Sequence, residues 1–479
     1  MALTSLTFLL FIVVMAAISG LIRAPLWRKT VLLLASFGFI ASYAPSLLSV
    51  LPFAGFVLVG YAAIIAAKRW PSGHVASALA IAGFIGLFVW LKHYAFVAFI
   101  PALAFPYLML GASYVLFRIL HLAFEVRDGA MEPPPLLDYL VYVLFFPAFL
   151  SGPINRYDGF AEDVANPKGM DRDEAFRTLG RIVLGFFKVA VTGEIARILY
   201  ADWADRIAGA AASPAPLAAA TFTLAAGFYF VFLYLNFSGS MDIAIGVGRM
   251  FGIVLPENFN RPLRAANYQD FWARWHITLS NWFKAYFYNP LVKALMTRFG
   301  ASRALAPYLG VIASFAVFMV LGAWHGASVE FMLSGVFYAV GVCTNQLYQV
   351  QMNKRLGKKP YKALAANPAY ILVGRGMTIA FHALATSPFW LSIEQLGVVW
   401  QAIGPLGVLG AYVGLSLLVS AICLAWDMVA AVLPRPAADA PVRPHGVVLR
   451  GAALALAVIA LVFILPLVNS PPELIYKAF

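Results

Sequence analysis

The amino-acid sequence predicts an all-α, polytopic membrane protein, and three observations predict it. Hydrophobic residues make up 62% of the 479 residues and charged residues only 11%. A soluble domain has about 25% charged residues, so this chain has too few charges to cover a surface in water. The apolar residues gather in runs of roughly 15–22 residues without a period of two, which favours membrane helices over a membrane β-barrel. Basic residues recur between the runs, as they do in cytoplasmic loops.

Thirteen apolar runs are candidate membrane spans. In chain order they cover residues 3–22, 31–51, 53–67, 76–91, 94–124, 136–150, 182–201, 215–236, 306–324, 328–348, 368–391, 406–432 and 447–468. The first lacks a basic leader and a cleavage site, so we expect a retained helix. Pro101 and Pro106 break the fifth, and Pro434–Pro444 is expected to be a loop. Several runs are short for a full crossing, so we expect about 11 to 13 membrane helices, some of them tilted or half-inserted.

The excess of positive charge indicates the orientation of the chain. Lysine plus arginine number 34 against 21 aspartate plus glutamate, a formal net charge of +13. The positive-inside rule explains this balance by basic loops held in the cytoplasm, and no nucleic-acid partner is needed. Four segments are basic: the loops after the first and third runs, residues 353–362, and the segment before the last run. Placing them in the cytoplasm puts both termini outside, while residues 125–150 fit neither side cleanly.

The interval 255–303 differs from both a span and an ordinary loop. It carries seven basic residues against Glu257 and Asp270, together with three tryptophans and several other aromatic residues. Such a segment is too polar to face lipid. We expect helices that lie at the cytoplasmic interface, or that dip into the protein and return. A polar, aromatic and partly buried segment of this kind indicates a site.

Two of the seven histidines occur in settings that favour chemistry. His276 lies in the run RWHITLSNW, and His325 is followed by glycine in GAWHGAS. Ionisable residues at membrane depth are costly and are functional candidates, and histidine is the usual general base near neutral pH. The predicted orientation puts His325 at an extracytoplasmic turn and His276 on the cytoplasmic side, which indicates a path through the protein. His121 and His382 are expected to be hydrogen-bonded interior histidines.

The sequence contains no competing set of catalytic residues. Cys343 and Cys423 both fall in apolar runs and form no metal or disulfide motif. Walker A, HExxH and nucleophile-elbow motifs are absent from the sequence, and the pair Gly246 and Gly248 has no third glycine of a dinucleotide loop. We therefore expect no bound cofactor and no metal site.

Five ordered motifs resemble the membrane-bound O-acyltransferase (MBOAT) family, in its bacterial branch. They are FFPAFLSGPINRY (145–157), FSGSMDIAIG (237–246), LPENFNRP (255–262), FWARWHITLS (271–280) and WHG (324–326). The resemblance implies an MBOAT fold around a central tunnel, in one integral membrane domain over 1–479 of the bacterial cytoplasmic membrane. Within it we expect N-terminal helices (1–135), a catalytic core (136–348) and C-terminal helices (349–479).

The resemblance also implies transfer of an acyl group from a cytoplasmic thioester to a hydroxyl outside, with His325 catalytic and His276 lining the tunnel. Ten further residues would shape the tunnel and core, or serve only as scaffold: Asp242, Asn258, Asn260, Trp272, Arg274, Trp275, Ser280, Trp282, Trp324 and Arg156. The donor would be a carrier-protein phosphopantetheine or an acyl-CoA. The acceptor would be a polymer or an acyl-relay protein outside. The chain offers no convincing covalent nucleophile, so direct transfer is expected.

Two branches of the family remain open. Residues 125–129 (EVRDG), 151–157 and 288–296 are more similar to the D-alanyltransferase branch (DltB), which we favour. The extra C-terminal spans and the ending after Pro472 are more similar to the polysaccharide O-acetylase branch (AlgI). Ser240, Lys284 with Ala285, and Val329 depart from the family pattern, which leaves the acyl specificity open.

Two hypotheses of other classes remain beside the enzyme. A glycan or lipid transporter would predict inverted repeats, paired broken helices and charges spread along the spans. We find no internal repeat, and the polar residues concentrate in the interval 255–303. A non-catalytic scaffold would use that same surface to recruit partner proteins. As an enzyme, the chain would use it to dock an acidic carrier protein.

Overall fold

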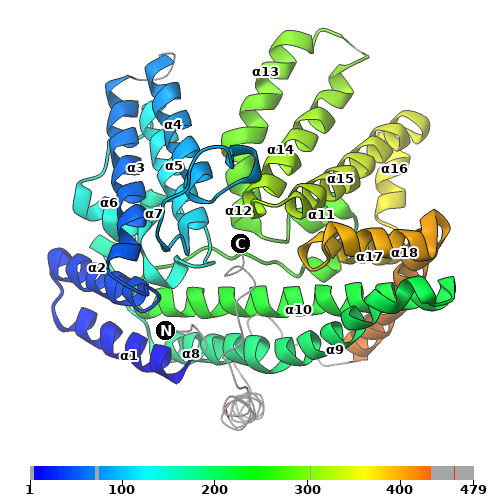
Figure 1. The fold of residues 1–479 in the computed structure, drawn as a ribbon, viewed down its shortest axis with the longest axis horizontal. Coiled ribbons are helices and arrows are strands. Elements are labelled where there is room, and N and C mark those ends of the chain that lie inside the picture. Colours follow the sequence, from blue (N-terminus) through cyan, green and yellow to red (C-terminus); the bar gives the residue numbers. More distant parts are fainter. Residues whose placement is uncertain (1–4, 71–74, 303, 433–457, 459–479) are drawn as a thin grey trace. The chain divides into compact units, whose positions relative to one another are not determined.

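A computed structural model describes residues 5–70, 75–302, 304–432 and 458 (Figure 1). Within these residues every regular element is a helix, apart from one isolated β-bridge between Phe259 and Trp275. The predicted all-α class is therefore confirmed. The predicted loop 434–444 and, apart from residue 458, the predicted span 447–468 lie outside the described residues.

Within the described ranges, four helical segments are long and apolar enough to cross a membrane. They are Leu48–Arg69, Ala215–Met250, Ala306–His325 and Ile393–Val432, and two shorter apolar helices cover Thr7–Leu21 and Val75–Leu91. Their outer faces are apolar as well: Leu406 is 82% exposed and Leu417 is 67% exposed. A protein in water rarely exposes contiguous apolar faces, whereas lipid favours them. The helices and their outer faces fit the predicted membrane protein.

The described chain forms two compact units whose segments alternate along the sequence. Among the described residues, the first comprises those within 5–191 and 236–257 together with residue 458, and the second comprises those within 192–235 and 258–432. One boundary falls inside helix α10 (Ala215–Met250), between Leu235 and Asn236. The predicted subdivision at residues 135 and 348 stays a prediction.

The first unit is a set of helices of moderate length. They are α1 (Leu6–Leu21), α2 (Pro25–Ala41), α3 (Leu51–Arg69), α4 (Val75–Leu91), α5 (Ala112–Arg127), α6 (Leu136–Val143), α7 (Tyr157–Ala165) and α8 (Arg172–Phe187), with short 3-10 turns at Leu48–Val50, Ala95–Val97 and Phe146–Ala148. Helix α3 packs against both α4 and α5, and α2 packs against α1 and α6.

The phenylalanine-rich motif that begins at Phe145 lies at the centre of the first unit. Phe146 is fully buried, and its ring contacts those of Phe8, Phe39 and Phe251 at centroid distances of 6.5, 5.8 and 5.5 Å. The buried Arg118 guanidinium donates hydrogen bonds to the carbonyl groups of Val143 and Ala148. An arginine from α5 therefore satisfies the backbone where α6 ends, since buried carbonyl groups need partners.

The structure confirms the break predicted in one span and corrects the extent of two others. In 94–124 only α5 is a long helix, because Pro101 and Pro106 occur in the irregular stretch before it. The run 136–150 holds only the eight-residue α6 and a 3-10 turn. The run 182–201 lies within a longer helical stretch, in which a π-helical turn at Lys188–Thr192 joins α8 to α9 (Gly193–Asp205).

The second unit holds the long C-terminal helices and the interval predicted to contain the site. Its further helices are α11 (Tyr268–Trp272), α12 (Ile277–Phe283), α13 (Asn289–Phe299), α14 (Leu309–His325), α15 (Val329–Leu356), α16 (Lys358–Ala365), α17 (Pro368–Ala385) and α18 (Ile393–Val432), with a π-helical turn at Lys284–Tyr288. Residues 258–302 thus form short helices instead of a span, as expected. A kink at Gly404, which has a φ of 58°, divides α18 just before Pro405.

Glycine lets α14 and α15 approach closely, and Figure 1 shows them side by side. A side chain at Gly335 would come within 2.7 Å of the carbonyl oxygen of Phe318 and 2.9 Å of the Cα atom of Gly322. Small residues at such a crossing allow backbones to pack in a membrane helix pair. This packing fixes the end of α14, where His325 is the last helical residue.

Candidate active site

The segment before α12 holds His276 in an unusual backbone conformation. Residues 258–260 run antiparallel to 274–277: the N–H of Asn260 donates to the carbonyl oxygen of Arg274 at 2.9 Å, and that of Ile277 to Asn258 at 3.0 Å. His276 precedes the first residue of α12 with φ 46° and ψ 51°, in the left-handed region. A residue with a side chain pays roughly 1 kcal/mol or more for this conformation, and such strain clusters at functional sites.

Asn258 fixes the orientation of the His276 ring. Its Oδ1 atom is buried and accepts hydrogen bonds from the Thr278 backbone N–H at 3.1 Å and from the Thr278 hydroxyl at 2.9 Å. The same oxygen lies 3.2 Å from Nδ1 of His276. Because a carbonyl oxygen can only accept, Nδ1 must carry the proton, and Nε2 carries the lone pair of the neutral ring.

Burial also keeps His276 neutral. The side chain is 2% exposed, and the pKa of its imidazole is lowered well below the usual value, first by burial and second by the nearby His325. Desolvation disfavours the charged ring, and a second positive charge close by disfavours it further. His276 therefore stays unprotonated at neutral pH.

His325 lies at the turn from α14 to α15, as predicted. Its ring is 6% exposed and contacts the rings of Trp324 at a centroid distance of 4.9 Å and Phe389 at 5.2 Å. Trp324 also lies 6.4 Å from the ring of His276, so one tryptophan contacts both histidines. At Gly326 a Cβ atom would come within 2.1 Å of the Phe331 ring, so glycine is needed directly after the histidine.

An aromatic cluster contributed by four segments lies against His325. The ring of His382, on α17, contacts the rings of Phe271, Trp272 and Trp275. The same ring stacks on that of Tyr338, on α15, at a centroid distance of 5.3 Å. Tyr338 in turn contacts Phe389, the neighbour of His325. The cluster forms a continuous wall beside the catalytic candidates. Aromatic pairs of this geometry stabilise the fold by more than their buried area alone would give.

The expected interior role of two other histidines is confirmed. His382 is 1% exposed, and its Nδ1 lies 3.1 Å from the hydroxyl oxygen of Tyr268. Nε2 of His121 accepts a hydrogen bond from the backbone N–H of Tyr157 at 3.2 Å. Sequence reasoning did not place His382, Tyr338 or Phe389 beside the site, because they come from helices outside the recognised motifs.

The remaining candidates of the second unit lie at the margin of this cluster. The side chain of Arg274 is partly buried and pairs with Asp270 at 2.7 Å, while Asn260 is exposed. The Ser280 hydroxyl lies 3.5 Å from the carbonyl oxygen of Trp275. Trp282 contacts Tyr286 at a centroid distance of 5.1 Å. These contacts fit scaffold roles that hold the short helices together.

Two candidates belong to the first unit. The Asp242 carboxylate, on α10, accepts from Nε of Arg181 at 3.0 Å and from Nζ of Lys188 at 2.7 Å. Arg181 also makes a bidentate contact of 2.6 Å with Glu257. The side chain of Arg156 is 64% exposed and pairs with Glu125 at 3.0 Å, and its place at the tunnel or core stays a prediction. Its exposed setting is that of a surface ion pair.

Replacing Asp242 by asparagine should destabilise the protein by about 2 kcal/mol. The change leaves two half-buried cations beside each other without their shared carboxylate. Thermal or denaturant unfolding of the purified protein measures the loss. The matched control is Asp202→Asn, whose exposed pair with Arg206 should contribute almost nothing. Equal stability of the two variants would contradict a structural role for Asp242.

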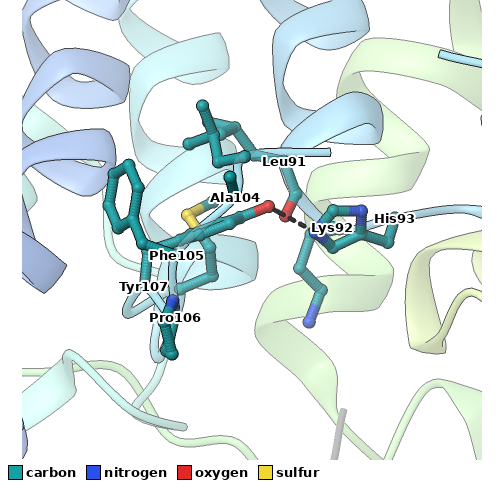
Figure 2. Close-up of a pocket in the computed structure, with 9 residues that line it drawn as sticks. Leu91, Lys92, His93, Ala104, Phe105, Pro106 and Tyr107 are labelled. Atoms are coloured by element: carbon teal, nitrogen blue, oxygen red, sulfur yellow. Dashed lines mark hydrogen bonds between the residues drawn. The ribbon is translucent and has the colours of Figure 1, made fainter. Parts of the chain in front are cut away.

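A separate pocket lies in the first unit, shown in Figure 2. It has a volume of about 650 Å³ and is lined by residues that flank the irregular stretch before α5. The Tyr107 hydroxyl donates to the carbonyl oxygen of Leu91 at 2.8 Å and lies 2.5 Å from Nε2 of His93.

In the part of the chain that the structure describes, no three histidine, cysteine or acidic side chains cluster closely enough to hold a metal ion.

An all-helical membrane protein with two buried histidines beside an aromatic wall is suited to chemistry within a membrane. The profile of the MBOAT, membrane-bound O-acyltransferase family matches residues 76–382, more than half of the chain. The chain belongs to this family, and the protein is an O-acyltransferase. This membership decides against the transporter and scaffold hypotheses.

Curated relatives carry two kinds of acyl transfer in their names. A teichoic acid D-alanyltransferase of Bacillus subtilis is 29% identical over 288 residues, 58% of this chain and 69% of the relative. One from Streptococcus thermophilus is 30% identical over 53% of this chain and 60% of the relative. A peptidoglycan O-acetyltransferase of Helicobacter pylori is 33% identical over 44% of this chain, but this covers only 38% of the relative. The chain therefore spans less than two thirds of the last two.

Proposed function

We propose that this protein transfers a D-alanyl group from a cytoplasmic thioester to a hydroxyl of a cell-envelope polymer outside the bacterial cytoplasmic membrane. The similarity to teichoic acid D-alanyltransferases supports the acyl group, and the basic loops support the orientation. The observation that carries the chemistry is the pair His276 and His325, both buried and joined through Trp324. The chain would cross the membrane several times.

The reaction that this geometry supports is a direct transfer. His325 accepts the proton of the acceptor hydroxyl while the oxygen attacks the thioester carbonyl carbon. The carbon–sulfur bond then breaks, and the leaving thiolate takes up the proton from the imidazolium. A thioester is already activated, so the proposal needs neither a cofactor nor an acyl-enzyme.

His276 serves this proposal as a positioning residue. Asn258 holds its Nδ1–H, so the lone pair of Nε2 points along a fixed direction. A neutral, oriented imidazole can accept a hydrogen bond from the donor without adding a charge that would repel a protonated His325. The antiparallel pairing of residues 258–260 with 274–277 holds the backbone of His276 at φ 46° and so fixes where the ring lies.

The donor on the cytoplasmic side is proposed to be a carrier protein or a CoA thioester. Exposed basic side chains occur at Arg261, Arg264, Lys284, Lys293 and Arg298. Carrier proteins are typically acidic, and complementary charge speeds their encounter. The positive-inside rule accounts for the same charge, so donor docking needs its own test.

A second candidate is transfer of an acetyl group to a polysaccharide or to peptidoglycan. The relative with the highest of the quoted identities, at 33%, is a peptidoglycan O-acetyltransferase. Both candidates share the site and differ only in the donor and acceptor. The residues that depart from the family pattern, such as Ser240 and Val329, do not separate them.

Membranes containing the protein should transfer label from D-alanyl carrier protein to an envelope polymer, and transfer less from an acetyl thioester. The two donors are offered in parallel, with His325→Ala membranes as the control. Label from acetyl alone would move the protein to the O-acetylase branch. Label from neither donor, with the protein folded, would contradict both proposals.

A further inference from the structure

The second unit contains a pocket that the acyl transfer does not use. It has a volume of about 410 Å³, and its lining residues come from α11, α15, α16, α17 and α18 and the segment before α11. This size is in the range of small-ligand sites. Tyr268, which lies at its wall, is hydrogen-bonded to His382, so the aromatic cluster closes the pocket on that side.

The walls of the pocket favour an apolar ligand. Val340, Val373 and Met377 line it and are 48%, 55% and 45% exposed. The amide oxygens that line it already have partners: Oδ1 of Asn267 accepts from the N–H of Asp270, and that of Asn345 from Gln349. A hydrocarbon chain fits against these apolar side chains because it needs no hydrogen-bond partner.

Basic side chains surround one rim of the pocket. Helix α16 contributes the lining residues Tyr361 and Ala365, and Lys358 and Lys362 each lie three positions before one of them. Residues three apart are neighbours on a helix surface. Both lysines are exposed, and no ion pair joins them to a carboxylate within the described ranges. Lys354, Arg355 and Lys359 are further basic residues in the same stretch of the sequence.

We propose that this pocket binds one anionic phospholipid of the cytoplasmic leaflet. The phosphate lies at Lys358 and Lys362, and one acyl chain fills the space between α15 and α17. Basic clusters place a loop on the cytoplasmic side, where anionic lipids concentrate, and basic pockets between membrane helices bind their headgroups. The apolar side chains of the wall favour an acyl chain, and competition with coenzyme A, which also carries a phosphate, separates a lipid from a thioester donor.

Native mass spectrometry of the purified full chain with phosphatidylglycerol tests this site. We expect Lys358→Gln with Lys362→Gln to weaken binding about thirtyfold, since each basic side chain near an anionic headgroup contributes about fivefold. Ala365→Trp, which fills the pocket from α16, should also remove the bound lipid. Phosphatidylcholine with the same chains should bind more weakly than phosphatidylglycerol.

The matched control is Lys293→Gln with Arg298→Gln, which removes two exposed charges from α13 of the same unit. It should leave phosphatidylglycerol binding within about twofold. Glycerol phosphate and coenzyme A are added as competitors, and neither should displace the lipid. Equal binding by all three variants would overturn the site, and displacement by coenzyme A would assign the pocket to the donor.

Discussion

Replacing His325 by alanine should reduce acyl transfer by about a thousandfold while the protein stays folded. A general base contributes roughly a hundredfold to ten thousandfold to a reaction of this type. His325 is the last residue of α14 and is buried against Trp324 and Phe389. Truncating its ring leaves the glycine contacts between α14 and α15 in place, so folding should be kept.

The measurement is the rate of label transfer in membranes with equal amounts of folded protein. Gel filtration and thermal unfolding report the folded fraction. His325→Gln tests the role of the base directly, since it keeps much of the side-chain volume without a basic nitrogen. His93→Ala, an exposed histidine of the first unit, is the control for loss of any imidazole. Transfer within about tenfold of normal in both His325 variants would remove His325 from the mechanism.

The sequence predicted the all-α membrane fold class because the composition of membrane helices specifies them. The beginning of α2 shows where a prediction from hydropathy fails. The apolar run 31–51 was expected as a span, with Arg28 and Lys29 in the basic loop before it. Instead α2 begins at Pro25, and Arg28 is buried within it. Its guanidinium donates to the carbonyl oxygens of Val164 and Phe251, both at 2.6 Å. A charge satisfied by distant backbone cannot be recognised from local hydropathy.

In the candidate site, too, some residues are predictable from the sequence and others depend on the tertiary fold. His276 and His325 stand out in the sequence because they are ionisable residues in aromatic, glycine-bearing runs. The hydrogen bonds that orient His276 depend on antiparallel pairing between residues 258–260 and 274–277. The hydrophobic periodicity of the sequence does not predict this pairing. His382 and Phe389 join the wall only because α17 returns beside α11 and α15. Such neighbours follow from the tertiary fold, and the local sequence around them reads as ordinary membrane helix.

Replacing Asn258 by leucine should reduce transfer about a hundredfold and destabilise the protein by about 3 kcal/mol. Leucine removes the oxygen that accepts from His276 and twice from Thr278, and each buried donor left without a partner costs about 1–3 kcal/mol. A displaced His276 ring also lowers the transfer rate, because small displacements of groups in an active site reduce the rate strongly. Label transfer and denaturant unfolding measure the two effects.

Asn258→Asp separates positioning of His276 from a general loss of structure. A carboxylate keeps the acceptor oxygen, so stability and most of the activity should return at high pH. The added negative charge should raise the pKa of His276, which burial now holds well below its usual value. His276 would then be protonated at a higher pH than before, so the acid limb of the transfer rate should move upward in pH. An unchanged pH profile in a folded, active Asn258→Asp protein would show that the neutral form of His276 is not required for transfer.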